Sequence, residues 1–160
     1  MARRREPEYR VEELHSVARE GHIIDVDAAT SARMGNIRQH GTTPELLVRS
    51  AVRALGHRYR TTNRDLPGNP DLANRRRRWA IFVHGCFWHR HPGCRLTTTP
   101  TRNRQFWLDK FDRNERRDAA AIVALRASGY AVMVVWECET RDVARLVSQI
   151  DTWFARAVVR

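Results

Sequence analysis

The chain has 160 residues, 42% of them hydrophobic, a length and composition typical of one compact domain with its own core. It has no apolar run of about 18 residues, which excludes a membrane-spanning helix, and its charged N-terminus lacks the apolar stretch of a signal peptide, so we expect a cytoplasmic protein. The formal net charge of +11 favours a polyanionic partner, and nucleic acid is the commonest one.

The N-terminal segment, residues 1–30, is predicted to be a flexible or partly helical arm, because it is polar and has no sustained apolar period. Residues 31–160 are predicted to form the folded domain. Its first helix is predicted from Pro44 to Leu55, with Thr43 as the cap and Gly56 as the stop signal.

Extended segments are predicted next. Two short ones cover His57–Thr61 and Asp71–Ala73, separated by the turn-rich Leu66–Pro70. Trp79–Val83 is a continuous apolar run, as expected of a strand that is buried on both faces. A loop dense in His, Cys and Thr follows from His84 to about Thr101.

The C-terminal part is predicted to contain a long helix, a strand and a final helix. The long helix covers Asn103–Ala127 and ends at Gly129, Tyr130–Trp136 is a second buried strand, and the last helix covers about Asp142–Ala157. This order predicts an α/β fold with a mixed central sheet flanked by helices. It is also the order of the restriction-endonuclease-like core.

Arginine supplies nearly all the positive charge, because Lys110 is the only lysine among the 29 basic residues. Arginine binds phosphate in a bidentate manner and stacks on bases. A G+C-rich genome would explain arginine in place of lysine, and a solvated surface is a further alternative. Neither explains the sign of the net charge.

Asp71 follows a Gly/Pro turn at the start of a short strand. Such a carboxylate is held rigidly and suits a hard divalent ion such as Mg²⁺. On the Pro-Asp dipeptide alone, an ordinary turn residue is the better interpretation. Nucleases usually continue with an acidic residue and a lysine on the next strand, but Trp79–Val83 has neither. Nuclease chemistry would therefore need another base.

The segment His84–Cys94 supplies candidates, because it contains three histidines, two cysteines and the aromatic pair Phe87-Trp88. One histidine alone is easily explained as structural, but the whole cluster is poor core material. The odd cysteine count of three argues against a disulfide framework, and three thiols need a fourth ligand to complete a tetrahedral zinc site.

Four motifs resemble those of the very-short-patch repair endonucleases, in matching order and spacing over about residues 30–140. The motifs are Leu66–Asp71 (LPGNPD), His84–His89 (HGCFWH), Phe106–Lys110 (FWLDK) and Val135–Cys138 (VWEC). The resemblance implies a DNA mismatch endonuclease with a restriction-endonuclease-like core and a structural zinc site.

The resemblance also implies catalytic roles. Asp71 would bind the catalytic Mg²⁺ together with the main-chain carbonyl of Val83, where the family usually has threonine. His89 would be the general base, which answers the missing lysine. His84 would order metal-bound water or phosphate, and Glu45 would lie near the metal. An equally good interpretation of Glu45 is that the helix dipole favours an acidic residue in the first turn of a helix.

The implied zinc ligands are Cys86, His91, Cys94 and Cys138. The family usually has one residue fewer before the second cysteine, and Pro92-Gly93 lies in that stretch. A closed set of four such ligands is typical of a structural site.

The aromatic residues Phe87, Trp88 and Trp107 would insert into the DNA stack beside the mismatch, with Met34 entering from the minor-groove side. Unstacking a T:G wobble costs less free energy than unstacking a matched pair. Aromatic rings that insert between the bases would therefore favour mismatched over matched DNA. For Trp107 alone, core packing on the long helix is the favoured alternative.

The predicted function is therefore Mg²⁺-dependent nicking 5′ to the T of a T:G mismatch that arises from 5-methylcytosine deamination. The expected partner is mismatched double-stranded DNA, bound by a monomer in the bacterial nucleoid. Two alternatives stay open: a same-fold nuclease with an antiphage or restriction target, and a non-catalytic zinc-stabilised DNA-binding domain. A metalloprotease is disfavoured because no H-E-x-x-H motif occurs.

Overall fold

The computed structural model describes residues 41–157; the predicted N-terminal arm and Met34 lie outside this range. The described elements follow the predicted order, with a 3-10 helix added before the last α-helix. In chain order they are α3 (Thr43–Ala54), β1 (Leu72–Asn74), β2 (Trp79–His84), α4 (Arg104–Ala127), β3 (Ala131–Trp136), η1 (Glu137–Arg141) and α5 (Val143–Ala157).

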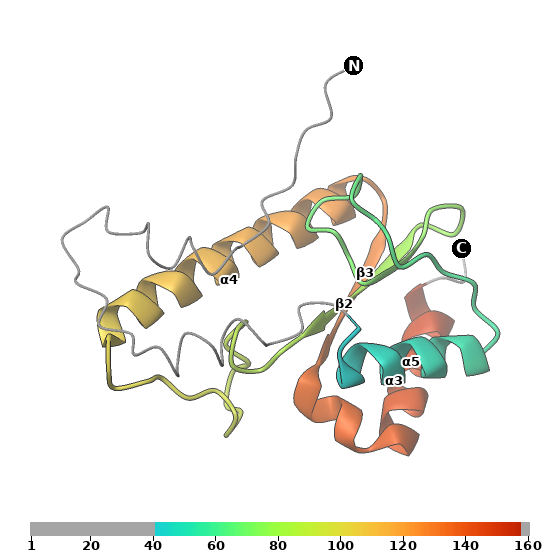
Figure 1. The fold of residues 1–160 in the computed structure, drawn as a ribbon. Coiled ribbons are helices and arrows are strands. Elements are labelled where there is room, and N and C mark those ends of the chain that lie inside the picture. Colours follow the sequence, from blue (N-terminus) through green and yellow to red (C-terminus); the bar gives the residue numbers. More distant parts are fainter. Residues whose placement is uncertain (1–40, 158–160) are drawn as a thin grey trace.

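Within residues 41–157 the strands form one three-stranded sheet in the order β1-β2-β3 (Figure 1). β1 runs antiparallel to β2, with Leu72 opposite Ile81. β3 runs parallel to β2 through the crossover helix α4, and His84 lies opposite Trp136 at the end of this pair. The mixed α/β architecture is therefore confirmed, and β2 is the central strand that leads into the His- and Cys-rich loop.

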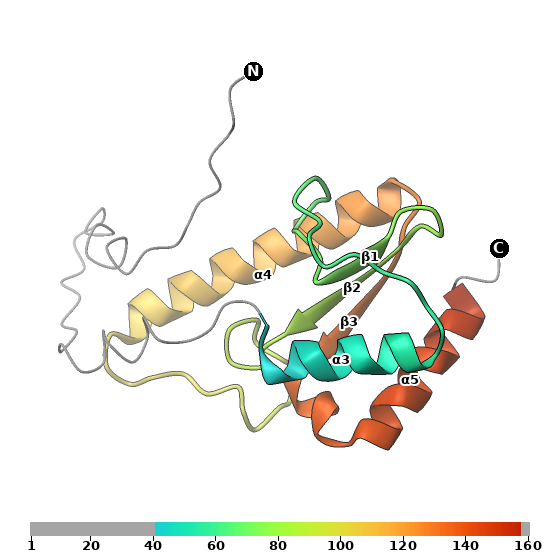
Figure 2. The ribbon, with the colours of Figure 1, turned by 45° about the vertical axis from the view of Figure 1, so that its right-hand side comes forward.

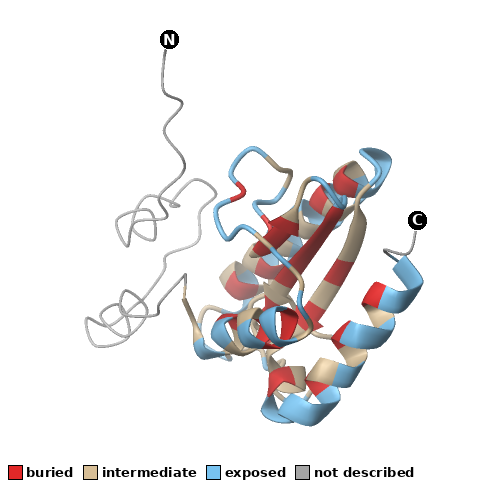
Figure 3. Ribbon diagram, turned by 90° about the vertical axis from the view of Figure 1, so that its right-hand side faces the viewer, coloured by how far each residue is buried: buried red, intermediate tan, exposed pale blue. Residues whose placement is uncertain are grey.

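Helices cover both faces of the sheet, with α3 and α5 on one face and α4 on the other (Figure 2). Successive side chains of a strand point to opposite faces. Trp79 and Ile81 of β2 accordingly join the core under α3 and α5, whereas Ala80 and Phe82 join the core under α4. Buried residues run along the strands and the inward sides of the helices (Figure 3). This two-sided burial explains the continuous apolar run of β2.

α4 is a helix of 24 residues that packs one side on the sheet. Its buried residues are Trp107, Phe111, Ala121 and Leu125, at spacings that return to the same side of a helix. Among the described helices, α4 included, none is long and apolar enough to cross a membrane.

Two predicted boundaries need correction at the start and end of α3. Thr42, not Thr43, adopts the extended backbone of the cap, so the helix begins one residue earlier than predicted and Pro44 takes its second position. Leu55 is the C-cap rather than a helical residue. Gly56 follows with a φ of +79°, as expected of a glycine that ends a helix.

Two of the predicted strands differ in the structure. His57–Thr61 makes only an isolated bridge, between Arg60 and Ala73. β3 is less buried than predicted, since only Met133 and Val135 are buried and its other residues are half-buried. The reason is its place at the edge of the described sheet, where it has a hydrogen-bonded neighbour on one side alone.

Candidate active site and cysteine-histidine cluster

The turn before β1 holds Asp71 in place. Gly68 has a φ of +72°, and a Cβ there would lie 2.5 Å from the Cβ of Ala121 in α4, so the turn packs so closely that only glycine fits. The buried side chain of Asn63 donates a hydrogen bond of 2.9 Å to the carbonyl of Pro70. Asn63 was not predicted from the sequence, because a single asparagine carries no motif. Together these contacts fix the backbone just before Asp71.

The carboxylate of Asp71 lies against the main chain of Val83. Its Oδ2 accepts a hydrogen bond of 2.7 Å from the Val83 N–H. In an extended strand the N–H and the carbonyl of one residue point to the same side. The Val83 carbonyl therefore faces the side on which Asp71 lies, which is the arrangement that the predicted metal ligands need.

Two histidines and an aspartate meet where β2 ends. The rings of His84 and His89 are stacked with centroids 4.0 Å apart and planes 11° from parallel. His89 Nδ1 is hydrogen-bonded to Oδ2 of Asp118 in α4. The potential ligand atoms of all three residues lie within 4.8 Å of one another. The structure thus brings together both predicted histidines and adds a carboxylate.

The electrostatics favour a neutral His84 beside an ionised Asp118. Burial, then the neighbouring His89, lowers the pKa of His84 to about 4. For Asp118, burial opposes ionisation, but the hydrogen bond from His89 and the charges of its neighbours, Arg117 among them, outweigh the burial and lower the pKa of Asp118. An ionised Asp118 accepts a hydrogen bond from Nδ1 of His89, so in the neutral tautomer of this ring Nε2 is the nitrogen that can accept a proton.

Asp118 is the functional candidate that the sequence prediction missed. The signal was its position: Asp118 lies seven residues after Phe111 and three before Ala121, on the inward side of α4 where apolar residues are expected. An acidic residue on that side of a helix needs a partner, and His89 provides it.

The His84–His89–Asp118 group suits proton transfer better than magnesium binding. Mg²⁺ prefers carboxylate, carbonyl and water oxygens, whereas two of these three groups are imidazoles. A base within hydrogen-bonding distance of a residue that orients it is the usual arrangement in general base catalysis.

Glu45 has a local role in the structure. Its buried carboxylate accepts hydrogen bonds from the Gly41 N–H at 2.9 Å and the Thr42 hydroxyl at 2.9 Å, and pairs with Arg49 at 3.0 Å. These contacts cap α3, as the helix-terminus interpretation implied. Its role beside a catalytic metal stays a prediction.

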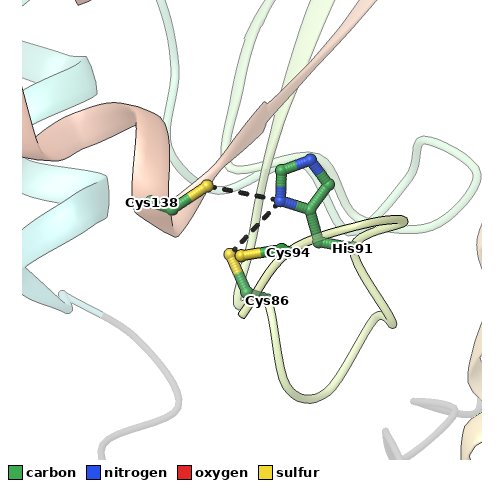
Figure 4. A group of neighbouring side chains, drawn as sticks. All are labelled: Cys86, His91, Cys94 and Cys138. Atoms are coloured by element: carbon green, nitrogen blue, oxygen red, sulfur yellow. Dashed lines mark hydrogen bonds between the residues drawn. The ribbon is translucent and has the colours of Figure 1, made fainter. Parts of the chain in front are cut away.

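Cys86, His91, Cys94 and Cys138 form a second cluster, with ligand atoms within 4.8 Å of one another. His91 Nδ1 is 3.3 Å from Sγ of Cys138 and 3.6 Å from Sγ of Cys86 (Figure 4). Pro92 and Gly93 are exposed, so the additional residue before Cys94 bulges outward while Cys94 still reaches the cluster. The four predicted ligands are therefore brought together from two distant segments.

The cluster fits a soft or borderline metal ion by its donor set, because three thiols and one imidazole are the ligands of structural zinc sites. Burial raises the pKa of Cys86 to about 12 and also raises that of Cys138. Both thiols therefore keep their protons unless a cation lies beside them, and binding of a metal ion would release those protons.

The aromatic residues of the loop pack together against the start of α4. Phe87 contacts Trp88, Trp107 and Phe111 in edge-on arrangements with centroids 5.0–5.5 Å apart. Lys110 lies 5.1 Å over the Trp88 ring. Trp107 is buried, whereas Phe87 and Trp88 are half-buried. Insertion of these rings into DNA would require them to leave this packing, and it stays a prediction.

Comparison with known proteins gives consistent matches. Residues 24–95 match the family model described as DNA mismatch endonuclease Vsr. The chain is 42% identical over 117 residues to the type II nicking enzyme V.XorIIP of Xanthomonas oryzae pv. oryzae. The aligned residues make up 73% of this chain and 85% of that protein. It is 36% identical over 125 residues to the DNA mismatch endonuclease Vsr of Escherichia coli, an alignment that covers 78% of this chain and 80% of that protein. It is also 36% identical to the type II nicking enzyme V.NaeI of Lentzea aerocolonigenes, an alignment that covers 79% of this chain and 78% of that protein.

Proposed function

The chain belongs to the Vsr family of DNA mismatch endonucleases, and on this basis we propose that it nicks one DNA strand 5′ to the T of a T:G mismatch by Mg²⁺-dependent hydrolysis. The mismatch would arise by deamination of 5-methylcytosine in the bacterial chromosome. The protein would act as a monomer with a restriction-endonuclease-like core.

The hydrogen-bonded pair of His89 and Asp118 is the observation that carries this proposal. It lies where β2 ends, and the turn that carries Asp71 is bonded to the same end of β2 through Val83. A DNA-binding module gives no reason for a base with an orienting carboxylate beside a rigid acidic turn. A metal-dependent hydrolase would use both, the carboxylate to hold the ion and the base to activate water.

In the proposed reaction Asp71 and the carbonyl of Val83 would hold Mg²⁺, which would supply stabilisation of the negative charge that develops on the phosphate. His89 accepts a proton from the attacking water through Nε2, and Asp118 stabilises the imidazolium that results. His84, neutral because of its burial, hydrogen-bonds the attacking water or a phosphate oxygen. No lysine is needed.

The second cluster would hold zinc in a structural role. Cys86 directly precedes the aromatic pair, and Cys138 lies in η1 just after β3. A closed four-ligand site would therefore tie the loop that carries His89 to the end of the sheet. The fold already supports this connection, because the Glu137 carboxylate accepts a 3.2 Å hydrogen bond from the Cys86 N–H.

Protein purified without added metal is expected to contain one zinc ion per chain by elemental analysis. His91→Ala should lower the zinc content and the melting temperature, by about 2–4 °C for every kcal/mol of stability lost. His57→Ala is the control, because His57 stacks on Phe154 under α5, away from the cluster. Metal-free protein of equal stability, with three free thiols, would contradict the zinc assignment.

The proposed mismatch recognition relies on Phe87, Trp88 and Trp107 as wedges. Phe87 and Trp88 directly precede His89 in the loop, and Trp107 contacts both of them from α4, which supports this proposal. Phosphate contacts by arginine would supply affinity without sequence preference. The net charge of +11 supports such contacts.

Trp88→Ala is expected to erase most of the preference for T:G over T:A duplexes, while weak and salt-dependent binding to both persists. The reason is that the ring contributes stacking at an opened base pair, about 1–3 kcal/mol per stacked base, and no charge. Binding titrations of both duplexes at two salt concentrations measure this, with Trp88→Phe as the variant that keeps a flat ring. An unchanged preference in Trp88→Ala would remove the wedge role.

A panel of duplexes tests the proposed substrate. Wild-type protein should nick T:G duplexes and leave matched duplexes intact in Mg²⁺. Cleavage of matched DNA would favour the same-fold nuclease with another target. Binding without cleavage in Mg²⁺ or Mn²⁺ would favour the non-catalytic module.

A further inference from the structure

A continuous series of ring contacts joins the cysteine-histidine cluster to the candidate base. The Trp136 ring is stacked on His91, with centroids 4.3 Å apart and planes 6° from parallel. The same indole meets His84 edge-on, at 5.4 Å and 74°. His84 in turn is stacked on His89 at 4.0 Å. Trp136 is thus the one side chain in these contacts that touches a residue of each cluster.

We propose that Trp136 is a positioning residue, through which the cysteine-histidine cluster fixes the orientation of His84 and, through it, of the base His89. This inference rests on the proposed function for its activity readout, but the packing that it describes does not depend on the substrate.

The geometry gives Trp136 two ring contacts that an aliphatic side chain would lack, one stacked on His91 and one edge-on to His84. Its backbone is fixed at the end of β3, where its register partner across the sheet is His84 itself. The main-chain N–H of Trp136 also donates a 2.7 Å hydrogen bond to Oε2 of Glu139. The other carboxylate oxygen of Glu139 accepts a 3.1 Å hydrogen bond from the side chain of Gln149. The main chain that carries the indole is therefore held from two sides, by the sheet and by η1.

The two ends of the series differ in what holds them. At one end, Asp118 binds His89 by a side-chain hydrogen bond. At the other end, His91 is next to the thiols of Cys86 and Cys138, so a metal ion in that cluster would set the plane of its ring. Between them, the His84 ring is stacked on His89, meets Trp136 edge-on and also contacts Phe82. Removal of the indole would take away the edge-on ring contact of His84 and leave its contacts with His89 and Phe82.

Trp136→Leu is expected to lower kcat for T:G nicking by about 10–100-fold, with little change in KM, because small displacements of catalytic groups have effects of this size. Trp136→Phe keeps a flat ring and should restore kcat to within a few-fold of wild type. Trp153→Leu is the matched control, since Trp153 packs edge-on against Trp79 in the core under α5. Zinc content is measured for every variant.

A readout without substrate is the proton resonance of the His89 Nδ1–H, which its hydrogen bond to Asp118 shifts downfield. The resonance should be sharp in the zinc-loaded wild type, Trp136→Phe and Trp153→Leu, and broadened in zinc-loaded Trp136→Leu and in chelated wild type. His89 does not contact Trp136 directly, so such a change reports displacement passed through His84.

Three outcomes would overturn the inference. They are an unchanged resonance and kcat in Trp136→Leu, equal impairment in Trp136→Phe and Trp136→Leu, or equal impairment in the Trp153→Leu control. If wild-type protein fails to nick T:G duplexes while Trp136→Leu still broadens the His89 resonance, the proposed function fails and the positioning role stands.

Discussion

Asp71→Asn is expected to reduce single-turnover nicking of a T:G duplex by on the order of 10³-fold or more, because a catalytic metal ion supplies several kcal/mol of charge stabilisation and each 1.4 kcal/mol is tenfold in rate. The amide keeps the shape of the side chain and an oxygen that can accept the 2.7 Å hydrogen bond from Val83, so the turn should stay folded. What it loses is the charged oxygen ligand.

Binding separates this expectation from a general loss of structure. Asp71→Asn removes a negative charge, so its affinity for the mismatch, measured in Ca²⁺, should be at least that of wild type. Raising Mg²⁺ or supplying Mn²⁺ should recover part of the rate. Asp151→Asn is the control, an exposed aspartate on α5. Full activity in Asp71→Asn would place the metal site elsewhere and remove the reason for pairing Asp71 with Val83.

His89→Ala is expected to lower the rate by about 10²–10⁴-fold, the usual contribution of a general base. Asp118→Asn should also lower it, by a smaller factor. Its amide can still bond to Nδ1, but it no longer carries the charge that stabilises the imidazolium. Mismatch binding should survive in both variants, because neither removes an arginine from the surface.

His57→Ala serves as the control for the loss of an imidazole, since that ring stacks on Phe154 at 3.6 Å under α5. A wild-type rate in His89→Ala would end its role as the base. Reduced activity in His89→Ala with a wild-type rate in Asp118→Asn would keep the base but remove the orienting role of Asp118.

The sequence by itself determined the element order and the local chemistry. The apolar run of β2 predicted a strand buried on both faces, and α4 was predicted to within one residue at its start. These signals are local, because a repeating apolar pattern or a cap is complete within a few residues. The His- and Cys-rich loop was recognised for the same reason, since most of its ligands lie in one short segment.

The same local reasoning was wrong where burial depends on neighbours in space. His57–Thr61 has the residues of a strand but only one bridge, and β3 is half-buried because of its edge position. The cap of α3 moved by one residue, since Thr42 and Thr43 are equal candidates by sequence and only the backbone distinguishes them.

Only the tertiary structure decided which groups meet. Asp118 lies 29 residues from His89, and Cys138 lies 47 from His91. No local pattern links residues so far apart; the crossover through α4 and the parallel pairing of β2 with β3 bring them together. Asn63 and Trp136 likewise gain their positions from contacts across the fold. The sequence determined the chemistry available at each position, while packing of distant segments decided which of those groups form a site, because only folding sets the distances between them.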